Sequence, residues 1–184
     1  MRTMMRQYKV QHRTEFSAWS DSVCEQVRRL PQWQSASPAL LFHALPDEPS
    51  LQALMDEAMN GGRQVLLPVV VDDDLELRAY HGVDSLSTGS FGIQEPVGDA
   101  FPVSKYNTIE LVLIPGMAFD TVGHRLGRGC GYYDRLLPRL PHALRVGICF
   151  PFQLVPEVPF ENHDIPVQMV LTGETMQMIN PKSL

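Results

Sequence analysis

Residues 109–135 read IELVLIPGMAFDTVGHRLGRGCGYYDR, and this stretch decides the class of fold. The segment from Ile109 to Ile114 is almost entirely apolar and ends at Pro115-Gly116, which is typical of a buried strand. Four glycines then fall within nine residues, and a helix is predicted from Tyr132 to Leu140. A strand, a glycine-rich loop and a helix in this order indicate an α/β protein.

The flanking sequence repeats this alternation. Between Thr14 and Leu30, apolar residues recur at steps of three and four, which predicts an amphipathic helix. A second helix is predicted from Ser50, as its N-cap, to Gly61-Gly62. Short apolar or alternating segments predict the other strands, at residues 38–44, 65–71, 75–80, 144–150 and 167–172. Residues 72–108 are otherwise rich in turn formers, so we expect an excursion across the surface there.

Strands that alternate with helices predict an α/β fold, in which helices cover both faces of a mostly parallel sheet. Ligands of such sheets collect at the carboxyl ends of the strands, so we expect the site in the loop after Ile114. The chain has no internal repeat and no clear linker, and 184 residues are ordinary for one domain. We therefore expect a single domain over residues 1–184.

The composition is that of an ordinary globular protein, with 44% hydrophobic and 20% charged residues. A formal net charge of −6 disfavours general binding to nucleic acid or to membrane surfaces. No apolar run approaches the roughly 20 residues of a membrane helix, and the first residues do not resemble a signal peptide. Three cysteines without CxxC spacing argue against a disulfide framework or a zinc cluster, so we expect a reducing cytoplasm.

The glycine-rich loop indicates anion binding. Its glycines allow backbone N–H groups to approach a ligand just before a helix, a geometry that suits phosphate. Arg125 and Arg128 lie among the glycines and Arg135 follows one turn later; guanidinium groups bind phosphate or carboxylate oxygens in pairs. The Walker pattern is excluded because no lysine occurs from Tyr106 to Pro181, and the spacing of the glycines does not fit the dinucleotide fingerprint. A purely structural tight turn is the alternative.

The run from Gly123 to Arg135 follows the pattern G-x-R-L-G-x-G-x-G-Y-Y-D-R. This pattern resembles the signature of the 5-formyltetrahydrofolate cyclo-ligases, also called 5,10-methenyltetrahydrofolate synthetases, and specifies ten of thirteen positions. Other landmarks similar to those of the family occur in the right order at Leu67-Pro68, residues 91–96 (FGIQEP), residues 115–120 (PGMAFD) and His163-Asp164. The resemblance therefore extends over nearly the whole chain.

The resemblance implies a three-layer α/β fold and an ATP- and magnesium-dependent reaction. In this reaction 5-formyltetrahydrofolate closes to 5,10-methenyltetrahydrofolate, and ADP and phosphate are released. A formamide oxygen is a poor leaving group, so it must first be phosphorylated; N10 then adds to the activated carbon and phosphate departs. No protein nucleophile is required, so catalysis would consist of positioning and charge stabilisation.

The resemblance also implies roles for individual residues. The residues expected at ATP are Arg2, Arg6, Gly123, Arg125, Leu126, Gly127, Arg128, Gly129, Gly131, Tyr132 and Tyr133. Those expected to take part in catalysis are Arg125, Tyr132 and Tyr133. The folate substrate would contact Arg6, His43, Glu48 and Tyr132, and magnesium would be held by Asp134 and Asp164.

Several of these residues have structural alternatives. Asp134 could simply favour the helix dipole, and two adjacent tyrosines on a helix cannot both be fully buried. Phe91 and Phe119 could flank the pterin or pack in the core. The sequence also departs from the family pattern, with Arg2 in place of a lysine, Met5 in place of a leucine, and Ser50 and Leu51 after the substrate glutamate; Gln168 replaces a frequent Asp. Cys130, between two glycines, is expected to be a spacer.

Two other functions fit the same residues. One is a non-catalytic folate- or nucleotide-binding module, and the other is a phosphate-binding isomerase or transferase on a similar scaffold. The expected ligand in every case is a small molecule, with no nucleic acid or membrane as partner. We expect a monomer or a weak homo-oligomer.

Overall fold

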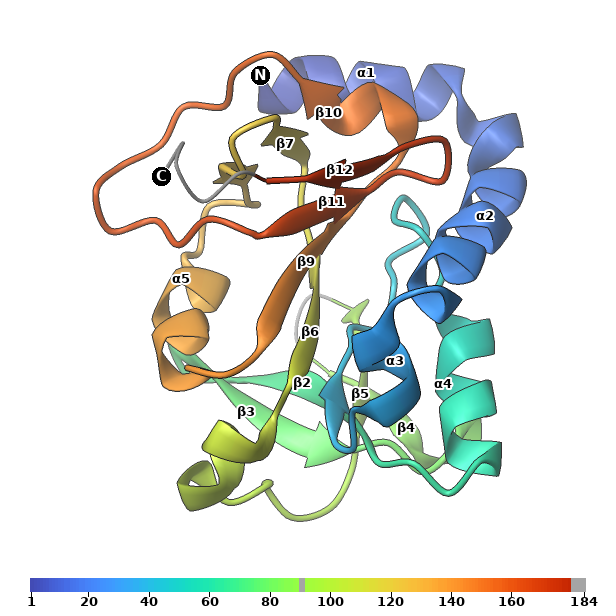
Figure 1. Ribbon diagram of the computed structural model, residues 1–184, viewed down its shortest axis with the longest axis vertical. Helices are drawn as coiled ribbons and strands as arrows, with labels where there is room; N and C mark the ends of the chain where they lie inside the picture. The colour runs from blue at the N-terminus through green and yellow to red at the C-terminus, as the bar shows by residue number, and fades with distance from the viewer. Residues whose placement is uncertain (90–91, 180–184) are drawn as a thin grey trace.

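A seven-stranded, mostly parallel sheet forms the centre of the fold (Figure 1). The computed structural model describes residues 1–89 and 92–179. Within these ranges the strands of the sheet are, in spatial order, β12 (Met176–Met178), β11 (Met169–Leu171), β9 (Leu144–Ile148), β6 (Leu111–Pro115), β1 (Ala39–Leu40), β2 (Val65–Val71) and β3 (Asp74–Ala79). The inner strands run parallel, while the edge strands β3 and β12 are antiparallel to their neighbours. The predicted mostly parallel sheet is confirmed.

The middle strand, β6, explains the apolar run at this point of the sequence. Leu111 and Leu113 pack into the core on one face of the sheet, and Val112 and Ile114 pack into the core on the other. All four side chains are fully buried. Because successive side chains of a strand point to opposite faces, a strand covered on both faces needs a continuous apolar sequence.

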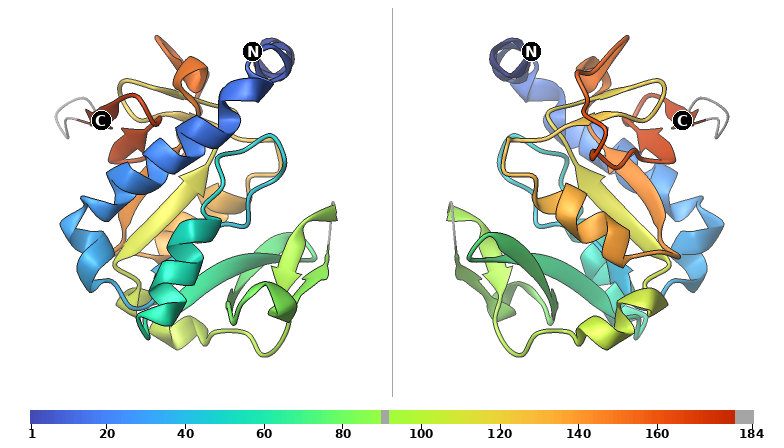
Figure 2. Two further views of the ribbon diagram at one scale, coloured as in Figure 1. Left: turned by 90° about the vertical axis from the view of Figure 1, so that its right-hand side faces the viewer. Right: turned by 90° about the vertical axis from the view of Figure 1, so that its left-hand side faces the viewer.

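Helices cover both faces of the sheet, which gives the predicted three layers (Figure 2). On one face lie α2 (Phe16–Arg28), α3 (Pro31–Ser35) and α4 (Gln52–Asn60). On the other face lie α5 (Tyr132–Leu136) and the 3₁₀ turns η4 (Val103–Thr108) and η5 (Leu137–Arg139). Shorter 3₁₀ turns are η1 (Arg13–Glu15), η2 (Val83–Ser85) and η6 (Pro151–Gln153). Among the described residues, no helix combines the length and apolar character needed to cross a membrane.

A second, three-stranded sheet follows the carboxyl end of β6 and carries the start of the glycine-rich loop. Its strands are β10 (Leu154–Val155), β7 (Ala118–Asp120) and β8 (Arg125–Leu126). Helix α1 (Arg2–Gln11) packs on this sheet through Met5, which shares a buried cluster with Met117 and Leu126. The sequence did not predict this helix, because Met5 and Lys9 are its only buried residues and leave little apolar periodicity.

Several elements are shorter than predicted. The strand expected at residues 38–44 pairs only through Ala39–Leu40, and β9 and β11 also end before the predicted limits. The helix expected to reach Leu140 ends at Leu136 and continues as η5, because Pro138 has no N–H for a helical hydrogen bond.

The predicted N-cap of the second helix is wrong. Leu51, and not Ser50, is the N-cap of α4, although the Ser50 hydroxyl accepts the Gln52 N–H at 3.4 Å. Ser50 is held by α2 instead, because its N–H donates to the Ser20 hydroxyl at 3.1 Å and its carbonyl accepts from the Cys24 thiol at 3.5 Å.

The excursion between residues 72 and 108 contains more strand than the sequence indicated. After β3, a hairpin of β4 (Leu86–Thr88) and β5 (Gln94–Pro96) extends from the sheet (Figure 2). The hairpin is attached to β2 through Glu95, whose carboxylate accepts the Val70 N–H at 3.1 Å. Phe91 lies outside the described residues.

We expect Gly147→Ala to destabilise the protein by about 1–3 kcal/mol, the usual cost of overpacking a core. A Cβ at this position of β9 would lie 2.5 Å from Cε1 of Phe119, which is fully buried. Urea unfolding measures the change. Gly61→Ala is the matched control, because Gly61 is exposed at the end of α4 with a φ of −81°. Equal losses in the two variants would contradict the packing argument.

Candidate active site

Asp120 fixes the turn that leads into the glycine-rich loop. This carboxylate is 1% exposed. Its Oδ1 accepts the N–H groups of Val122 at 3.0 Å and His124 at 2.9 Å, and its Oδ2 accepts the N–H of Val158 at 3.1 Å. His124 Nδ1 lies 2.9 Å from Oδ2. The sequence analysis missed this anchor, although an Asp three residues before a glycine is a common sign of a side-chain-stabilised turn.

Two residues predicted at the nucleotide lie below the surface of the loop. Gly123 is buried with a φ of +97°; its N–H donates to Asp120, and its carbonyl accepts from Val167 at 2.9 Å. Leu126 packs into the cluster below α1, and its carbonyl accepts the Met117 N–H at 2.7 Å. Both residues therefore build the loop, and we leave them out of the ligand site proposed below.

The later glycines bring the loop close to two arginines. A Cβ on Gly127 would lie 2.8 Å from Nη1 of Arg125, so the loop passes directly over this guanidinium. Gly129 is exposed, with a φ of +114°, and its Cβ position lies 3.8 Å from Nη2 of Arg2. Gly131 has a φ of +66° and precedes the first turn of α5. The positive φ angles of Gly129 and Gly131 are conformations that favour glycine.

Arg125 is buried beneath the loop, with its side chain 6% exposed. Its Nη2 donates to both oxygens of Asp134, at 3.0 Å each, and its guanidinium lies 5.5 Å from the centre of the Tyr133 ring. Its Nε is buried and has no hydrogen-bond partner among the described residues. Part of the hydrogen-bonding capacity of this cation is therefore left for a ligand.

The two predicted magnesium ligands lie on neighbouring segments. Asp134 stands in the first turn of α5, and its Oδ1 also accepts the N–H of Ile165 at 3.4 Å. Asp164, the residue before, accepts the Glu161 N–H at 2.8 Å and is partly exposed. Magnesium at phosphates takes one or two carboxylates and fills the rest of its shell with phosphate and water oxygens. Two carboxylates beside the glycine-rich loop fit that requirement.

The two tyrosines of α5 are both partly buried. Burial raises the pKa of Tyr133, and the nearby carboxylate of Glu48 acts in the same direction, so its hydroxyl stays neutral and can donate. Tyr132 lies below Arg135, whose guanidinium is 5.3 Å from the ring centre. The expectation that the two rings cannot both be fully buried is confirmed.

Helix α1 brings Arg2 to the glycine-rich loop. Arg2 Nε donates to the carbonyl of Gly127 at 2.9 Å, across 125 positions of sequence. Arg6 follows one helical turn later and is exposed. The helix thus adds positive charge beside the glycines.

Arg128 and Glu48 form an ion pair between the glycine loop and the loop after β1. Oε1 of Glu48 accepts from Nη2 of Arg128 at 2.9 Å and from its Nε at 3.3 Å. Oε2 accepts the Leu45 N–H at 3.1 Å. The Glu48 side chain is 10% exposed, whereas that of Arg128 is 46% exposed. The predicted nucleotide and substrate residues therefore meet here.

Lys9 and Asp47 extend this ion pair, and the sequence analysis missed both. Lys9 is buried on α1, and its Nζ lies 2.9 Å from Oδ2 of Asp47. Oδ1 of Asp47 accepts from Arg128 Nη2 at 2.9 Å. Burial would raise the pKa of Asp47, but Lys9 and Arg128 outweigh it and hold the pKa below its usual value. The only sequence signal was a lysine four residues after Met5, on the same helical face.

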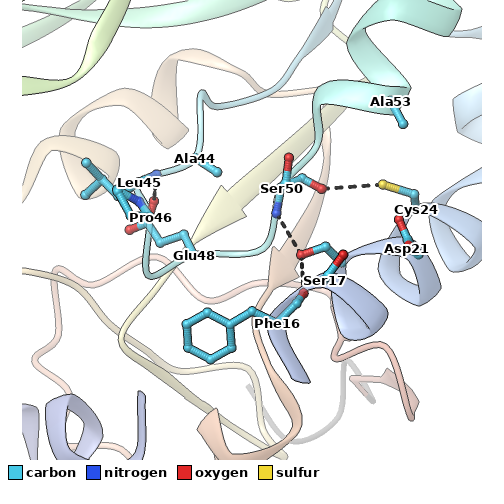
Figure 3. Close-up of a pocket in the computed structure, with 11 residues that line it drawn as sticks. Phe16, Ser17, Asp21, Cys24, Ala44, Leu45, Pro46, Glu48, Ser50 and Ala53 are labelled. Atoms are coloured by element: carbon cyan, nitrogen blue, oxygen red, sulfur yellow. Dashed lines mark hydrogen bonds between the residues drawn. The ribbon is translucent and has the colours of Figure 1, made fainter. Parts of the chain in front are cut away.

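A pocket of about 440 Å³ adjoins Glu48 (Figure 3). It is lined by Phe16, Ser17, Ser20, Asp21 and Cys24 of α2 and by Ala44, Leu45, Pro46, Glu48, Ser50 and Ala53. Burial raises the pKa of Cys24 to about 11, so this thiol stays protonated. The pocket wall is otherwise neutral, and its two carboxylates are those of Glu48 and Asp21.

Other candidates lie outside this pocket. His43 precedes it on the loop after β1 and does not line it; burial lowers the pKa of this imidazole. Phe119 is fully buried, so the alternative of core packing is confirmed. Leu51 is also a core residue. Gln168 accepts the Arg145 N–H at 3.0 Å, at the amino ends of β9 and β11 and thus away from the loops of the site.

The low pKa of Asp47 predicts a pH-dependent contribution to stability. A carboxylate with a lowered pKa stabilises the fold above its unfolded pKa of about 4, and this contribution is lost as the pH falls through the folded value. We expect Lys9→Met to reduce the free energy of unfolding, and the difference from the wild type to shrink below about pH 4. Urea unfolding between pH 3 and 6 measures it.

Lys105→Met is the control for this experiment, because Lys105 is an exposed lysine in η4. The difference in free energy of unfolding between Lys105→Met and the wild type should not depend on pH in this range. A Lys9→Met difference that stays constant or grows in acid would contradict the ion pair.

Comparison with known proteins shows the family of this chain. The model of the 5-formyltetrahydrofolate cyclo-ligase family matches residues 1–173. A Schizosaccharomyces pombe protein described as "Probable 5-formyltetrahydrofolate cyclo-ligase" is 30% identical over an alignment of 171 residues, and the alignment covers 84% of each chain. The 5-formyltetrahydrofolate cyclo-ligase of Escherichia coli (strain K12) is 32% identical over 142 residues, or 74% of this chain and 78% of that protein.

A solved structure gives the same result for the fold. The NMR structure of Aquifex aeolicus 5,10-methenyltetrahydrofolate synthetase superposes with a TM-score of 0.81 at 30% identity. The match covers 97% of this chain and 93% of the other. From the matched residues and the shared fold, the chain belongs to the 5-formyltetrahydrofolate cyclo-ligase family.

Proposed function

We propose that this chain catalyses the ATP-dependent cyclisation of 5-formyltetrahydrofolate to 5,10-methenyltetrahydrofolate. One observation carries the proposal: a glycine-rich loop and a pocket meet at the carboxyl ends of the strands. The loop lies over the buried Arg125, whose Nε has no partner among the described residues, and the pocket is lined by the carboxylate of Glu48. The loop suits a triphosphate, and the pocket suits an uncharged ring system that carries N–H donors. The names of the relatives describe this reaction.

The proposed role of the loop is to hold the phosphates and to stabilise charge. The backbone at Gly127, Gly129 and Gly131 would supply N–H donors, and Arg2 and Arg6 would add charge from α1. Arg125 is aimed from below at the phosphate that the formyl oxygen attacks. Donors fixed in advance stabilise developing charge without reorganisation, which is the main source of rate in phosphoryl transfer.

The proposed role of the pocket is to orient the folate. Glu48 accepts hydrogen bonds from pterin N–H groups, while Phe16 and the apolar part of the wall face the ring. Tyr132, Tyr133, His43 and Arg128 are the further residues that we propose for the junction between pocket and loop; Arg128 pairs with Glu48, and the Glu48 carboxylate lies near Tyr133. This arrangement would present the formyl oxygen to the loop, after which N10 adds to the formyl carbon and phosphate leaves.

Asp134 and Asp164 are the residues that we propose for magnesium. When bound, the cation would neutralise phosphate charge. In this chain Asp134 also orients Arg125, since both of its oxygens accept from Nη2. The same carboxylate therefore serves the arginine on one side and is available to a cation on the other.

The localisation, the partners and the oligomeric state of the enzyme are also proposals. Cys24, Cys130 and Cys149 are all free thiols, which is consistent with a reducing cytoplasm. The net charge of −6 favours a small-molecule substrate over nucleic acid or membrane surfaces. We propose a monomer or a weak homo-oligomer.

A non-catalytic binding module is the second candidate. Its support is the closed ion pair between Arg128 and Glu48, together with the departures from the family pattern at Ser50 and Leu51. Such a module would bind folate or nucleotide without forming product. A phosphate-binding isomerase or transferase, in contrast, would act without ATP.

The direct test mixes protein, 5-formyltetrahydrofolate, ATP and magnesium. We expect the near-ultraviolet absorbance of the methenyl product to rise with time, and to require ATP. Folded protein that binds both ligands but yields no product above background would favour the binding module.

We expect Arg125→Ala to lower kcat/KM by at least about a hundredfold, the usual loss when a fixed charge-stabilising donor is removed. Steady-state kinetics measure the change, and thermal unfolding checks that the variant is folded. Cys130→Ala is the control on the same loop, because this exposed side chain is assigned no role. An Arg125→Ala variant as active as Cys130→Ala would remove Arg125 from the site.

A further inference from the structure

Asp47 lies at the centre of a network of four charged residues. Its Oδ2 meets Nζ of the buried Lys9, and its Oδ1 meets Nη2 of Arg128, both at 2.9 Å. The same Nη2 lies 2.9 Å from Oε1 of Glu48. Arg128 is thus shared between two carboxylates, one of which, Glu48, is the proposed acceptor for the pterin.

Arg128 and the proposed folate both require acceptor positions on the Glu48 carboxylate. A carboxylate has about four acceptor positions, and three are already used: two by Arg128 on Oε1 and one by the Leu45 N–H on Oε2. A pair of pterin N–H donors needs two acceptor positions. The folate can therefore bind Glu48 fully only if Arg128 gives up Oε1.

Asp47 can keep its ion pair with Arg128 when the folate occupies the carboxylate of Glu48. Lys9 is 4% exposed and sits on a packed helix, so it cannot follow a moving partner and instead fixes the position of Asp47. Arg128 is 46% exposed, so its guanidinium has room to turn. With Asp47 fixed, the arginine retains one charged partner at the rim of the pocket.

We propose that Asp47 is a positioning residue. It holds Arg128 at the rim of the pocket while the Glu48 carboxylate exchanges its hydrogen bonds with Arg128 for hydrogen bonds with the folate. The inference rests on the proposed function, because it takes the folate to be the ligand of Glu48. Asp47 itself does not touch substrate. Without its charge, Arg128 has Glu48 as its remaining partner and competes with the folate for it.

The test is a double-mutant cycle with Asp47→Asn and Arg128→Ala. Alone, Asp47→Asn should raise the KM for 5-formyltetrahydrofolate about tenfold, since a charged hydrogen-bond partner is lost. The kcat and the KM for ATP should change by less than about twofold, because the proposed competition affects only the folate site. In the Arg128→Ala background, Asp47→Asn should change the KM for folate by less than about twofold, since no arginine remains to be held.

Two variants separate this role from a structural one. Asp47→Glu keeps a carboxylate and should restore most of the affinity for folate that Asp47→Asn loses. Asp84→Asn removes an exposed carboxylate of η2 and should leave all constants unchanged. Equal effects of Asp47→Asn in both backgrounds, or equal losses in kcat and in both KM values, would overturn the proposal.

A measurement without substrate distinguishes failure of this proposal from failure of the proposed function. NMR titration of the ligand-free protein should show a higher pKa of the Asp47 carboxyl in Arg128→Ala than in the wild type. An unchanged pKa would overturn the inference even in an active enzyme. Absence of the methenyl product in the wild type would overturn the proposed function, whatever the titration shows.

Discussion

The ion pair between Arg125 and Asp134 is the contact on which the geometry of the site depends. A guanidinium that is 6% exposed is costly to bury alone, and the bidentate carboxylate compensates the charge. The pair also joins strand β8 to the first turn of α5, and of the glycines between them Gly127 passes directly over the arginine. Buried charge, not apolar packing, therefore determines the path of this loop.

The rest of the site is assembled from segments that are far apart in the chain. Helix α1 reaches the loop through Arg2 and Gly127, and the loop after β1 reaches it through Glu48 and Arg128. These contacts are polar and partly exposed, whereas the core below them is apolar and closed. Contacts of this kind are individually weak and exchangeable, which is what a site that must admit two ligands requires.

The extent of prediction from sequence differed between the parts of the molecule. The strand at residues 109–114 and the loop after it were predictable, because an apolar run and closely spaced glycines are local signals. Arg125 was found for the same reason. Lys9 and Asp47 were not, since each is a single polar residue and they are 38 positions apart. Helix α1 was missed because most of it is exposed.

By itself the sequence determined the α/β class, the place of the glycine-rich loop and the resemblance to a family of cyclo-ligases. Only the tertiary structure decided which glycines lie against Arg125 and Arg2, which charges neutralise one another, and that Gly123 and Leu126 are buried under the loop. The physical reason is the separation along the chain over which each kind of interaction acts. Periodicity and turn chemistry act between neighbours in the chain, whereas burial and ion pairing depend on distances between residues that only the folded backbone brings together.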